Sequence, residues 1–298
     1  MGKTMDIKPV DRIFNDNRER MLGIGYRMLG AMTEAEDVVQ DAYLRWSNHW
    51  QQAQCTVIEN HQAFLTSVVT RLCLDKLRRR KIEKQVYVGP WLPEPVPSEE
   101  VSLEQELNQW QSVQTALLVM LESLSPRQRA VFTLAEMFDY SHQEIADLLD
   151  ITPANSRQLL RRAKRDMTVR SLPQAGLSKH TPVFEKFYEA LAEGDMAALE
   201  SMLCEDVVAY NDGGGKATAA IIPLEGIDRV ATVFGHVIRK RSDGASWHWQ
   251  SVNGQLGLVM TEQGIVTSVT TFAMKDEKIY RIYVTRNPEK LQAFTAAN

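Results

Sequence analysis

The chain has 298 residues, of which 44% are hydrophobic, and this is enough to bury two or three separate cores. Its formal net charge of -4 argues against a protein that coats nucleic acid nonspecifically, because such binding needs a cationic surface. We see no apolar run of the roughly 20 residues that span a bilayer and no apolar signal core at the start. The three cysteines show neither disulfide nor zinc-site spacing, so we expect a cytoplasmic protein without a metal or other cofactor.

Residues 1–88 form the first predicted module, which is helical because apolar residues return every three or four positions. Capping-box spacing at Thr33–Glu36 predicts a helix from there to about Trp50. Its predicted buried face holds Val39, Ala42, Tyr43, Trp46 and Trp50, and a stripe on the opposite face holds Asp37, Gln40, Asp41 and Leu44. An acidic stripe with an exposed leucine suits docking on a basic partner, although a solvated helix face is the alternative interpretation.

The next predicted helix covers residues 62–82 and carries most of the positive charge of this module. Between residues 69 and 84, Lys and Arg outnumber Asp and Glu by seven to two. The predicted outward face of this helix holds Arg71, Arg78 and neighbouring basic residues. A basic cluster at the end of a buried helix suits a DNA backbone, whereas an isolated basic run is more often a solvated face.

Two sequence runs in this module carry a family resemblance. YRMLGAMTEAEDVVQDAYLRW followed by FLTSVVTRLCLDKLRRR resembles region two of the extracytoplasmic-function RNA polymerase sigma factors. The resemblance implies that the first of these helices grips the clamp helices of the polymerase β′ subunit, through Asp37, Gln40, Asp41 and Leu44. It also implies that the basic helix meets and opens the minus-ten promoter element, through the candidate DNA contacts Arg71, Lys76, Arg78, Arg79 and Arg80.

Residues 89–112 are predicted to be an extended acidic linker. The run GPWLPEPVPSEE is too rich in proline to sustain a helix, and residues 85–126 contain no Lys or Arg.

Residues 113–172 are predicted to be a second helical module with a helix-turn-helix. Ser141 and Glu144 have the spacing of a capping box at the start of the first helix. Asp150 stands at the turn, where a left-handed conformation is needed. Thr152 and Pro153 suit the start of the second helix. The candidate base contacts are Asn155, Ser156, Arg157 and Gln158, and the candidate phosphate contacts are Arg161, Arg162 and Lys164. A purely structural helical pair is the alternative. LESLSPRQRAVFTLAEMFDYSHQEIADLL also resembles region four of the same sigma factors, which binds the minus-thirty-five element and the β flap.

Residues 182–298 are predicted to be an α+β domain. Helices near 182–193 and 195–203 precede β-rich runs, namely VVAY, ATAAIIPLEG, SWHWQSVNGQLGLVM and GIVTSVTTFAMKDEKIYRIYVTR. The last run contains DEK, a plausible hairpin turn. Helices followed by antiparallel strands indicate this fold class.

Three short motifs resemble the SigJ-like subgroup of these sigma factors, which carries a SnoaL-like extension. They are WLPEP (Trp91, Leu92, Pro93, Glu94, Pro95), DGGGK (Asp212, Gly213, Gly214, Gly215, Lys216) and NPEKL (Asn287, Pro288, Glu289, Lys290, Leu291). The resemblance implies a curved sheet around a cavity, packed on region two and on the linker. DGGGK lacks the full phosphate-loop pattern, so we expect a crowded interface loop.

The sequence therefore predicts a multidomain sigma factor that joins core RNA polymerase (β′ clamp helices and β flap) to promoter DNA and is regulated in cis by its C-terminal domain. The alternative is a SnoaL-like enzyme or ligand sensor fused to a DNA-binding module. Asp212, Asp228, His236 and His248 are the candidate acid–base groups. Single acids and histidines are usually structural, so we predict no enzyme, although the C-terminal cavity could hold a small molecule.

Overall fold

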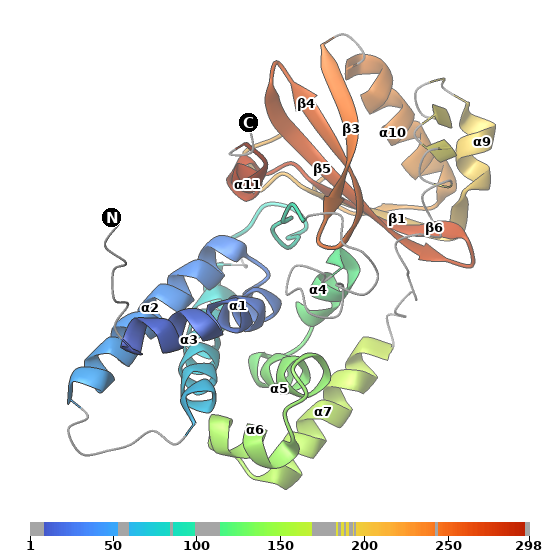
Figure 1. Ribbon diagram of the computed structural model, residues 1–298. Helices are drawn as coiled ribbons and strands as arrows, with labels where there is room; N and C mark the ends of the chain where they lie inside the picture. Colours follow the sequence, from blue (N-terminus) through green and yellow to red (C-terminus); the bar gives the residue numbers. More distant parts are fainter. Residues whose placement is uncertain are drawn as a thin grey trace, which may run out of the picture. The chain divides into compact units, whose positions relative to one another are not determined.

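The computed structural model describes residues 9–52, 60–83, 86–98, 114–168 and 183–295, except 184–185, 188, 191–192, 194 and 242–243. The chain divides into two compact units, each of which combines segments that are distant in sequence. The first unit consists of residues 1–83 and 120–170, and the second of residues 84–119 and 171–298. Figure 1 shows helices alone in the first unit, and a sheet with its helices in the second.

The first unit contains two groups of helices. The N-terminal group is α1 (Pro9–Leu29), α2 (Met32–Gln52) and α3 (His61–Glu83). The second group is α5 (Pro126–Met137), α6 (His142–Leu149) and α7 (Pro153–Thr168). Helix α4 (Thr115–Leu121) precedes this group in sequence, and all but its last two residues belong to the second unit.

Helix α2 follows the predicted amphipathic pattern, except that Tyr43 of the predicted buried face is only partly buried. Two further differences concern its ends. Val39, Ala42 and Trp46 are buried, but Trp50 is 39% exposed, because it lies in the last turn, where less of the bundle covers it. The helix begins at Met32, so Thr33 lies inside the first turn and does not precede it.

The helix-turn-helix has the predicted local chemistry. The Ser141 hydroxyl accepts a hydrogen bond from the amide of Glu144, and the Glu144 carboxylate accepts one from the amide of Ser141, which completes the capping box. Asp150 ends α6 with φ 54° and ψ 56°, the left-handed conformation that the turn requires. Thr152 Oγ1 accepts a hydrogen bond from the amide of Asn155 as α7 begins.

The two helical groups pack against each other within the first unit, where α3 contacts α5 and α6, and α1 contacts α5. Ser67 on α3 donates a hydrogen bond to the Leu148 carbonyl, and the hydroxyls of Thr66 and Tyr140 lie 2.9 Å apart. The Arg27 guanidinium lies over the ring of Phe138, and burial lowers its pKa to about 10.

The second unit contains a six-stranded sheet in the order β2-β1-β6-β5-β4-β3. The strands are β1 (Leu203–Asp212), β2 (Leu224–Glu225), β3 (Ala245–Val252), β4 (Gln255–Glu262), β5 (Ile265–Lys275) and β6 (Lys278–Thr285). The expected strand run was antiparallel, but β1 pairs with β6 in parallel. The expected DEK hairpin is present, and Asp276 and Glu277 take positive φ at its turn.

Helices α9 (Met196–Ser201) and α10 (Ile227–Arg241) cover one side of the sheet (Figure 1). Half of the predicted helix near 182–193 lies outside the described residues, and the described half, residues 183, 186–187, 189–190 and 193, is helical. The run ATAAIIPLEG forms only the two-residue strand β2, since its exposed residues Ile221 and Ile222 have no partner strand among the described residues.

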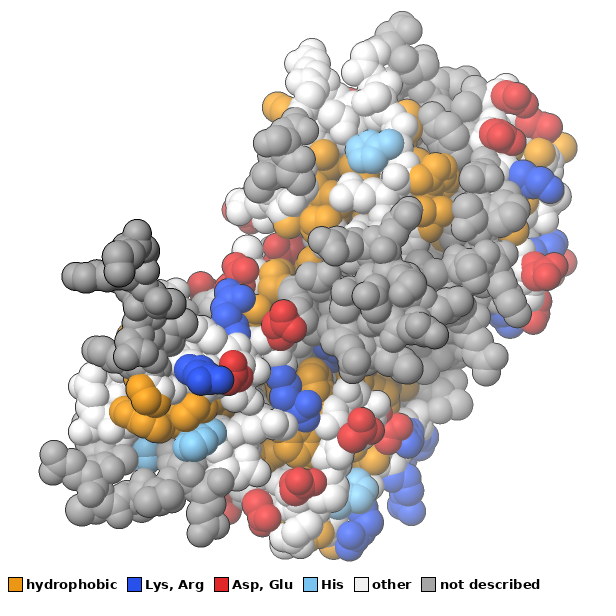
Figure 2. All heavy atoms as spheres, in the orientation of Figure 1, with side chains coloured by type: hydrophobic (Ala, Val, Ile, Leu, Met, Phe, Trp, Pro, Cys, Tyr) orange, Lys and Arg blue, Asp and Glu red, His pale blue; other side chains and the backbone are white. Residues whose placement is uncertain are grey.

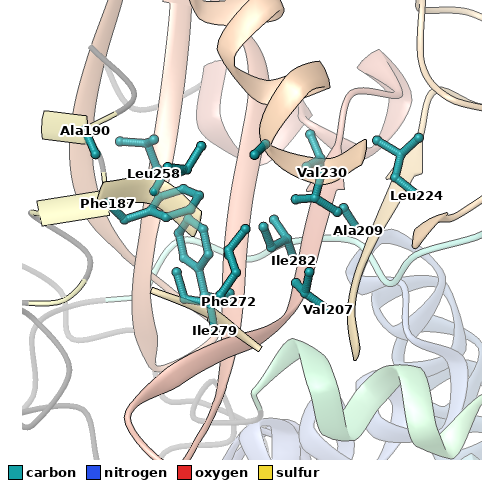
Figure 3. Packing of buried hydrophobic residues seen from close by; sticks show 14 of the residues in the cluster. Phe187, Ala190, Val207, Ala209, Leu224, Val230, Leu258, Phe272, Ile279 and Ile282 are labelled. Carbon is teal, nitrogen blue, oxygen red and sulfur yellow. The ribbon is translucent and has the colours of Figure 1, made fainter. Parts of the chain in front are cut away.

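The two faces of the sheet bury different residues, because successive side chains on a strand point to opposite sides. One face packs Val207, Phe272 and Ile282 against Val230 of α10, and Figure 3 shows these side chains pointing toward one another. We call it the helix face. The opposite face carries Tyr283 and Ala273, which pack with Leu92 of the linker, and we call it the linker face.

The compact units do not coincide with the predicted modules. The described part of the linker belongs with the C-terminal sheet, and the two helical modules form one unit. No described helix has the length and apolar character needed to cross a membrane.

Candidate functional sites

The predicted docking stripe is presented on one exposed face of α2. Asp37, Gln40 and Asp41 are exposed, and the Leu44 side chain is 55% exposed. Asp37 accepts a hydrogen bond from Lys76 of α3 at 3.1 Å, so the stripe is connected to the basic helix. An exposed leucine among acidic groups is the arrangement expected of a docking surface.

The basic residues of α3 divide into two sets. Arg71, Arg78 and Arg79 are exposed and Lys76 is partly exposed. Arg80 is only 7% exposed, because its guanidinium donates to the Leu29 carbonyl and pairs with Glu34. Arg80 is therefore not available as a DNA contact, contrary to the prediction, and it joins α3 to the end of α1 and the start of α2.

Helix α7 presents most of its predicted contacts to solvent. The exposed set is Arg157, Gln158, Arg161, Arg162 and Lys164, and Asn155 is partly exposed. Figure 2 shows Lys and Arg side chains gathered where Figure 1 places α7. Ser156 is fully buried, and its hydroxyl lies 2.9 Å from Nδ1 of His142, so it cannot reach a base edge while the motif is folded.

The three motifs of the SigJ-like resemblance meet at one place in the second unit, around the buried carboxylate of Asp212. This carboxylate accepts hydrogen bonds from the Tyr87 hydroxyl at 2.5 Å, the Leu92 amide at 2.8 Å and Lys290 Nζ at 2.7 Å. We call the residues Tyr87, Trp91, Leu92, Asp212, Asn287 and Lys290 the linker clamp. It joins the linker to strand β1 and to the NPEKL segment.

The charges of the clamp compensate each other. The Lys290 ammonium pairs with Asp212, donates to the Leu92 carbonyl, and lies 3.9 Å from the centre of the Trp91 ring. Burial, followed by the hydrogen bond to Asp212, raises the pKa of Tyr87, so its hydroxyl remains a donor at neutral pH. Asn287 donates to that hydroxyl in turn.

The glycines of DGGGK allow the clamp to close. Gly214 has φ +57°, and a Cβ there would lie 2.4 Å from the amide nitrogen of Asn287 and 2.9 Å from the Tyr87 hydroxyl. At Gly213 a Cβ would lie 2.3 Å from the Ala217 carbonyl. Lys216 forms an exposed ion pair with Glu289 outside the clamp. The loop is as crowded as the sequence predicted.

A second attachment of the linker was not predicted. The Val96 amide donates to Oδ1 of Asn253, the Asn253 amide donates to the Val96 carbonyl, and Nδ2 of Asn253 donates to Oγ1 of Thr115. Asn253 and Gly254 form the β3–β4 turn, and this pair is recognisable in the sequence as a turn, but nothing in the sequence points to its linker contacts. Pro93, Glu94 and Pro95 are buried between the two attachments.

The helix face of the sheet encloses a cavity of about 660 Å³. Its walls include Phe187, Phe234, Trp247, Leu258, Met260 and Phe272. Of the four candidate acid–base groups only His236 lines it. Asp212 lies in the clamp, Asp228 is exposed at the start of α10, and His248 is exposed on β3, so no constellation forms from them.

Four polar residues of the cavity were not singled out in the sequence, namely Asn211, Lys240, Glu262 and Arg286. Only the tertiary structure brings them to one space, and no motif connects them. Within the described ranges, no three His, Cys, Asp or Glu side chains gather in a way that could hold a metal ion.

Comparison with known families accounts for both helical modules. Residues 13–82 match Sigma-70 region 2, and residues 114–167 match Sigma-70, region 4. The chain is also 31% identical over 290 residues to the ECF RNA polymerase sigma factor SigJ of Mycobacterium tuberculosis, across 93% of this chain and 91% of that protein. The chain belongs to the extracytoplasmic-function RNA polymerase sigma factors.

The structural comparison extends this likeness to the C-terminal domain of the sigma factor. The crystal structure of Mycobacterium tuberculosis SigJ matches with a TM-score of 0.74 at 30% identity, across 94% of this chain and 97% of that one. A probable ECF sigma factor SigI from the same organism is 28% identical, across 97% of each chain. The fold predicted from the sequence, two helical sigma modules followed by a SnoaL-like sheet domain, is confirmed.

Proposed function

We propose that this sigma factor directs core RNA polymerase to promoters and that its C-terminal domain controls this activity by holding the linker between regions two and four. In the proposal, the α2 stripe of Asp37, Gln40, Asp41 and Leu44 binds the polymerase. The promoter contacts are Arg71, Lys76, Arg78 and Arg79 on α3, with Asn155, Arg157, Gln158, Arg161, Arg162 and Lys164 on α7.

The linker clamp is the observation that carries the regulatory part of the proposal. The segment between Tyr87 and Ser98 is part of the connection between region two, which ends at residue 82, and region four, which begins at residue 114. Two DNA-binding modules can reach separate promoter elements only if this connection permits their spacing. Three hydrogen bonds to the Asp212 carboxylate, one of which is the buried ion pair with Lys290, restrict the connection, so the clamp would set the range of spacings.

The packing within the first unit supports an opening step. Region two and region four contact each other through α3, α5 and α6, and Leu159 of α7 lies beside Arg71 and Arg78 in one small pocket. The basic helix therefore has part of its surface against region four. We infer that binding to polymerase and promoter separates the two regions and releases the linker to a new path.

Charge reversal tests the DNA contacts. Arg78→Glu and Arg161→Glu replace exposed cations by anions, so we expect each to reduce promoter-directed transcription by core polymerase at least about tenfold. Co-purification with core polymerase should persist, because the α2 stripe is unchanged. Lys186→Glu is the matched control, since Lys186 is an exposed cation of the C-terminal unit. Normal start-site selection by both region-two and region-four variants would refute the proposed contacts.

Loosening the clamp tests the regulation. Lys290→Gln removes the cation from Asp212 and from the Trp91 ring, so amide exchange across residues 87–98 should become faster. Promoter-directed transcription should change by at least about fivefold, the size of a small allosteric coupling. Lys216→Gln is the control, because its ion pair is exposed. A loosened linker with unchanged transcription would contradict regulation through the clamp.

Sigma factors are not an enzyme family, and we infer that the cavity of this chain binds without catalysing. Acid–base chemistry needs a proton-transfer group positioned on the reacting atom. Three of the four acid–base candidates, Asp212, Asp228 and His248, do not line the cavity, so His236 has none of them beside it there. Conversion of an added small molecule by the purified chain, lost in His236→Gln, would disprove this inference.

A further inference from the structure

The cavity under α10 has the size and wall of a small-molecule site. About 660 Å³ falls within the range of ordinary ligand pockets, which are mostly apolar with a few polar groups that orient the ligand. Aromatic and aliphatic side chains make up most of this wall, among them Phe187, Phe234, Trp247 and Phe272. A ligand for this space needs an apolar body.

The polar groups of the cavity identify the other end of the ligand. Nδ2 of Asn211 is buried and has no hydrogen-bond partner among the described residues, which is a costly state for a donor. Arg286 also lines the cavity, close to Asn211. Asn211 of β1 pairs with Val284 of β6, and Arg286 follows Val284 by two residues on the same side of the chain. Its Nη1 donates to the Thr218 carbonyl, which fixes the guanidinium in place. Both groups are donors, so the ligand must supply an acceptor.

The charge of the lining favours an anion as that acceptor. The cationic residues are Lys240 and Arg286, and the only carboxylate in the described part of the lining is Glu262. A carboxylate has two oxygens that accept hydrogen bonds from an amide and from a guanidinium together, and such charge-assisted bonds are the stronger kind.

We propose that this cavity binds an apolar monocarboxylic acid, with the carboxylate against Asn211 and Arg286 and the apolar body along Trp247, Leu258 and Phe272. This site is distinct from the polymerase and promoter contacts and lies wholly within the second unit.

The carboxylate end of the site lies directly behind the linker clamp. Asn211 precedes Asp212 on β1, and Arg286 precedes Asn287, so each of the two proposed carboxylate ligands has a clamp residue as its neighbour in the chain. The backbone amides of Arg286 and Asn287 both donate to the Asp212 carbonyl, at 2.7 and 2.9 Å. An acid bound to Asn211 and Arg286 therefore stiffens the segments that hold Asp212 and Asn287.

A fluorescent probe tests the binding without polymerase or DNA, so its result is independent of whether the sigma-factor proposal holds. The full chain is titrated with dansylamino-undecanoic acid and with the corresponding primary amine, and energy transfer from tryptophan to the dansyl group reports occupancy near Trp247. We expect saturable binding of the acid and at least about tenfold weaker binding of the amine. Equal affinity for acid and amine, or no binding of either, would overturn the proposal.

Two variants locate the probe. Asn211→Leu has nearly the same shape and cannot donate, so the affinity for the acid should fall roughly tenfold or more while that for the amine stays the same. Val233→Trp fills the cavity from α10 and should abolish binding of both probes. Unchanged binding of the acid in both variants would place the probe elsewhere and overturn the site. Should a variant fail to fold, displacement of the acid probe from the wild type by decanoate, and not by decylamine, decides the same question.

Amide exchange tests the connection to the linker, a step that rests on the proposed role of the clamp. With saturating dansylamino-undecanoic acid, residues 87–98 should exchange more slowly than in the free chain. Saturation of the cavity with no change in exchange there would refute the coupling.

Discussion

Asp212 shows how much one residue can decide in this protein. Its carboxylate is fully buried, and burial of an isolated charge costs several kcal/mol, so it requires a compensating cation and donors. Lys290, Tyr87 and the Leu92 amide meet that need from two distant parts of the chain. Asp212 therefore selects the path of the linker over the sheet.

Removing this charge should be costly. Asp212→Asn keeps the shape of the side chain and leaves Lys290 without its counter-charge, so the free energy of unfolding of the C-terminal unit should fall by about 3–5 kcal/mol. Lys216→Gln breaks only an exposed ion pair and should cost less than about 1 kcal/mol. Urea unfolding of the full chain, followed by tryptophan fluorescence, measures both changes. Equal losses would mean that the buried pair contributes no more than a surface pair.

Gly214 and Gly226 illustrate two different reasons why a position can require glycine, namely a positive φ and a lack of space for a Cβ. Both have positive φ, but a Cβ at Gly214 would displace the Asn287 amide, whereas a Cβ at Gly226 meets nothing within 4 Å. Gly226→Ala should therefore cost only the left-handed strain, about 1–2 kcal/mol. Gly214→Ala should cost clearly more and should accelerate exchange of the linker amides. If the two variants lose equal stability in thermal unfolding, the clamp tolerates a displaced Asn287.

At the scale of elements, local chemistry explains the helices better than it explains the sheet. The capping boxes at Ser125 and Ser141 and the left-handed Asp150 each act within a few residues, so the sequence contains the whole interaction. The sheet differs from the helices in this respect. Alternation along each strand predicts which residues share a face, but the segments that cover each face are distant in the sequence.

The capping box of α6 gives a prediction about pH. Ser141→Ala should lower the free energy of unfolding of the first unit by about 1 kcal/mol at pH 7. Hydrogen bonds from Ser141 lower the pKa of Glu144, so the stabilisation from its carboxylate is present above its ordinary pKa and is lost as the pH falls through the lowered value. The difference in thermal midpoint between wild type and Glu144→Gln should accordingly disappear in acid. A difference that persists at low pH would show that this charge is not its origin.

At the scale of the molecule, a buried ionic network connects regions two and four within the first unit. The Glu122 carboxylate accepts a hydrogen bond from Arg129 at 2.6 Å and lies 4.0 Å from Arg80, and Arg129 also donates to the Met28 carbonyl. Arg80 and Arg129 are nearly inaccessible, so the network resists water and holds α1, α3 and α5 together.

Neutralising the centre of this network should loosen the contact between the two regions. Glu122→Gln leaves two buried guanidinium groups without their shared anion, and the first unit should lose about 3–5 kcal/mol of stability. Glu136→Gln is the matched control, because its pair with Lys164 is largely exposed and should contribute less than about 1 kcal/mol. Denaturant unfolding followed by circular dichroism measures the loss. In Glu122→Gln, faster amide exchange confined to one region would contradict a network that spans both.

The sequence by itself determined the family, the helical modules, the helix-turn-helix and the strand-rich C-terminal domain, because these depend on periodicity, capping and motifs that act over short distances. It also singled out the motifs that contain Asp212, Leu92 and Lys290, but not the contacts between these residues. Tertiary structure alone decided that Arg80 and Ser156 are buried, that Asn253 is the second attachment of the linker, and that Asn211 and Arg286 share a cavity. The burial of a side chain and its pairing depend on contacts with segments far apart in the chain, and no local sequence pattern specifies those contacts.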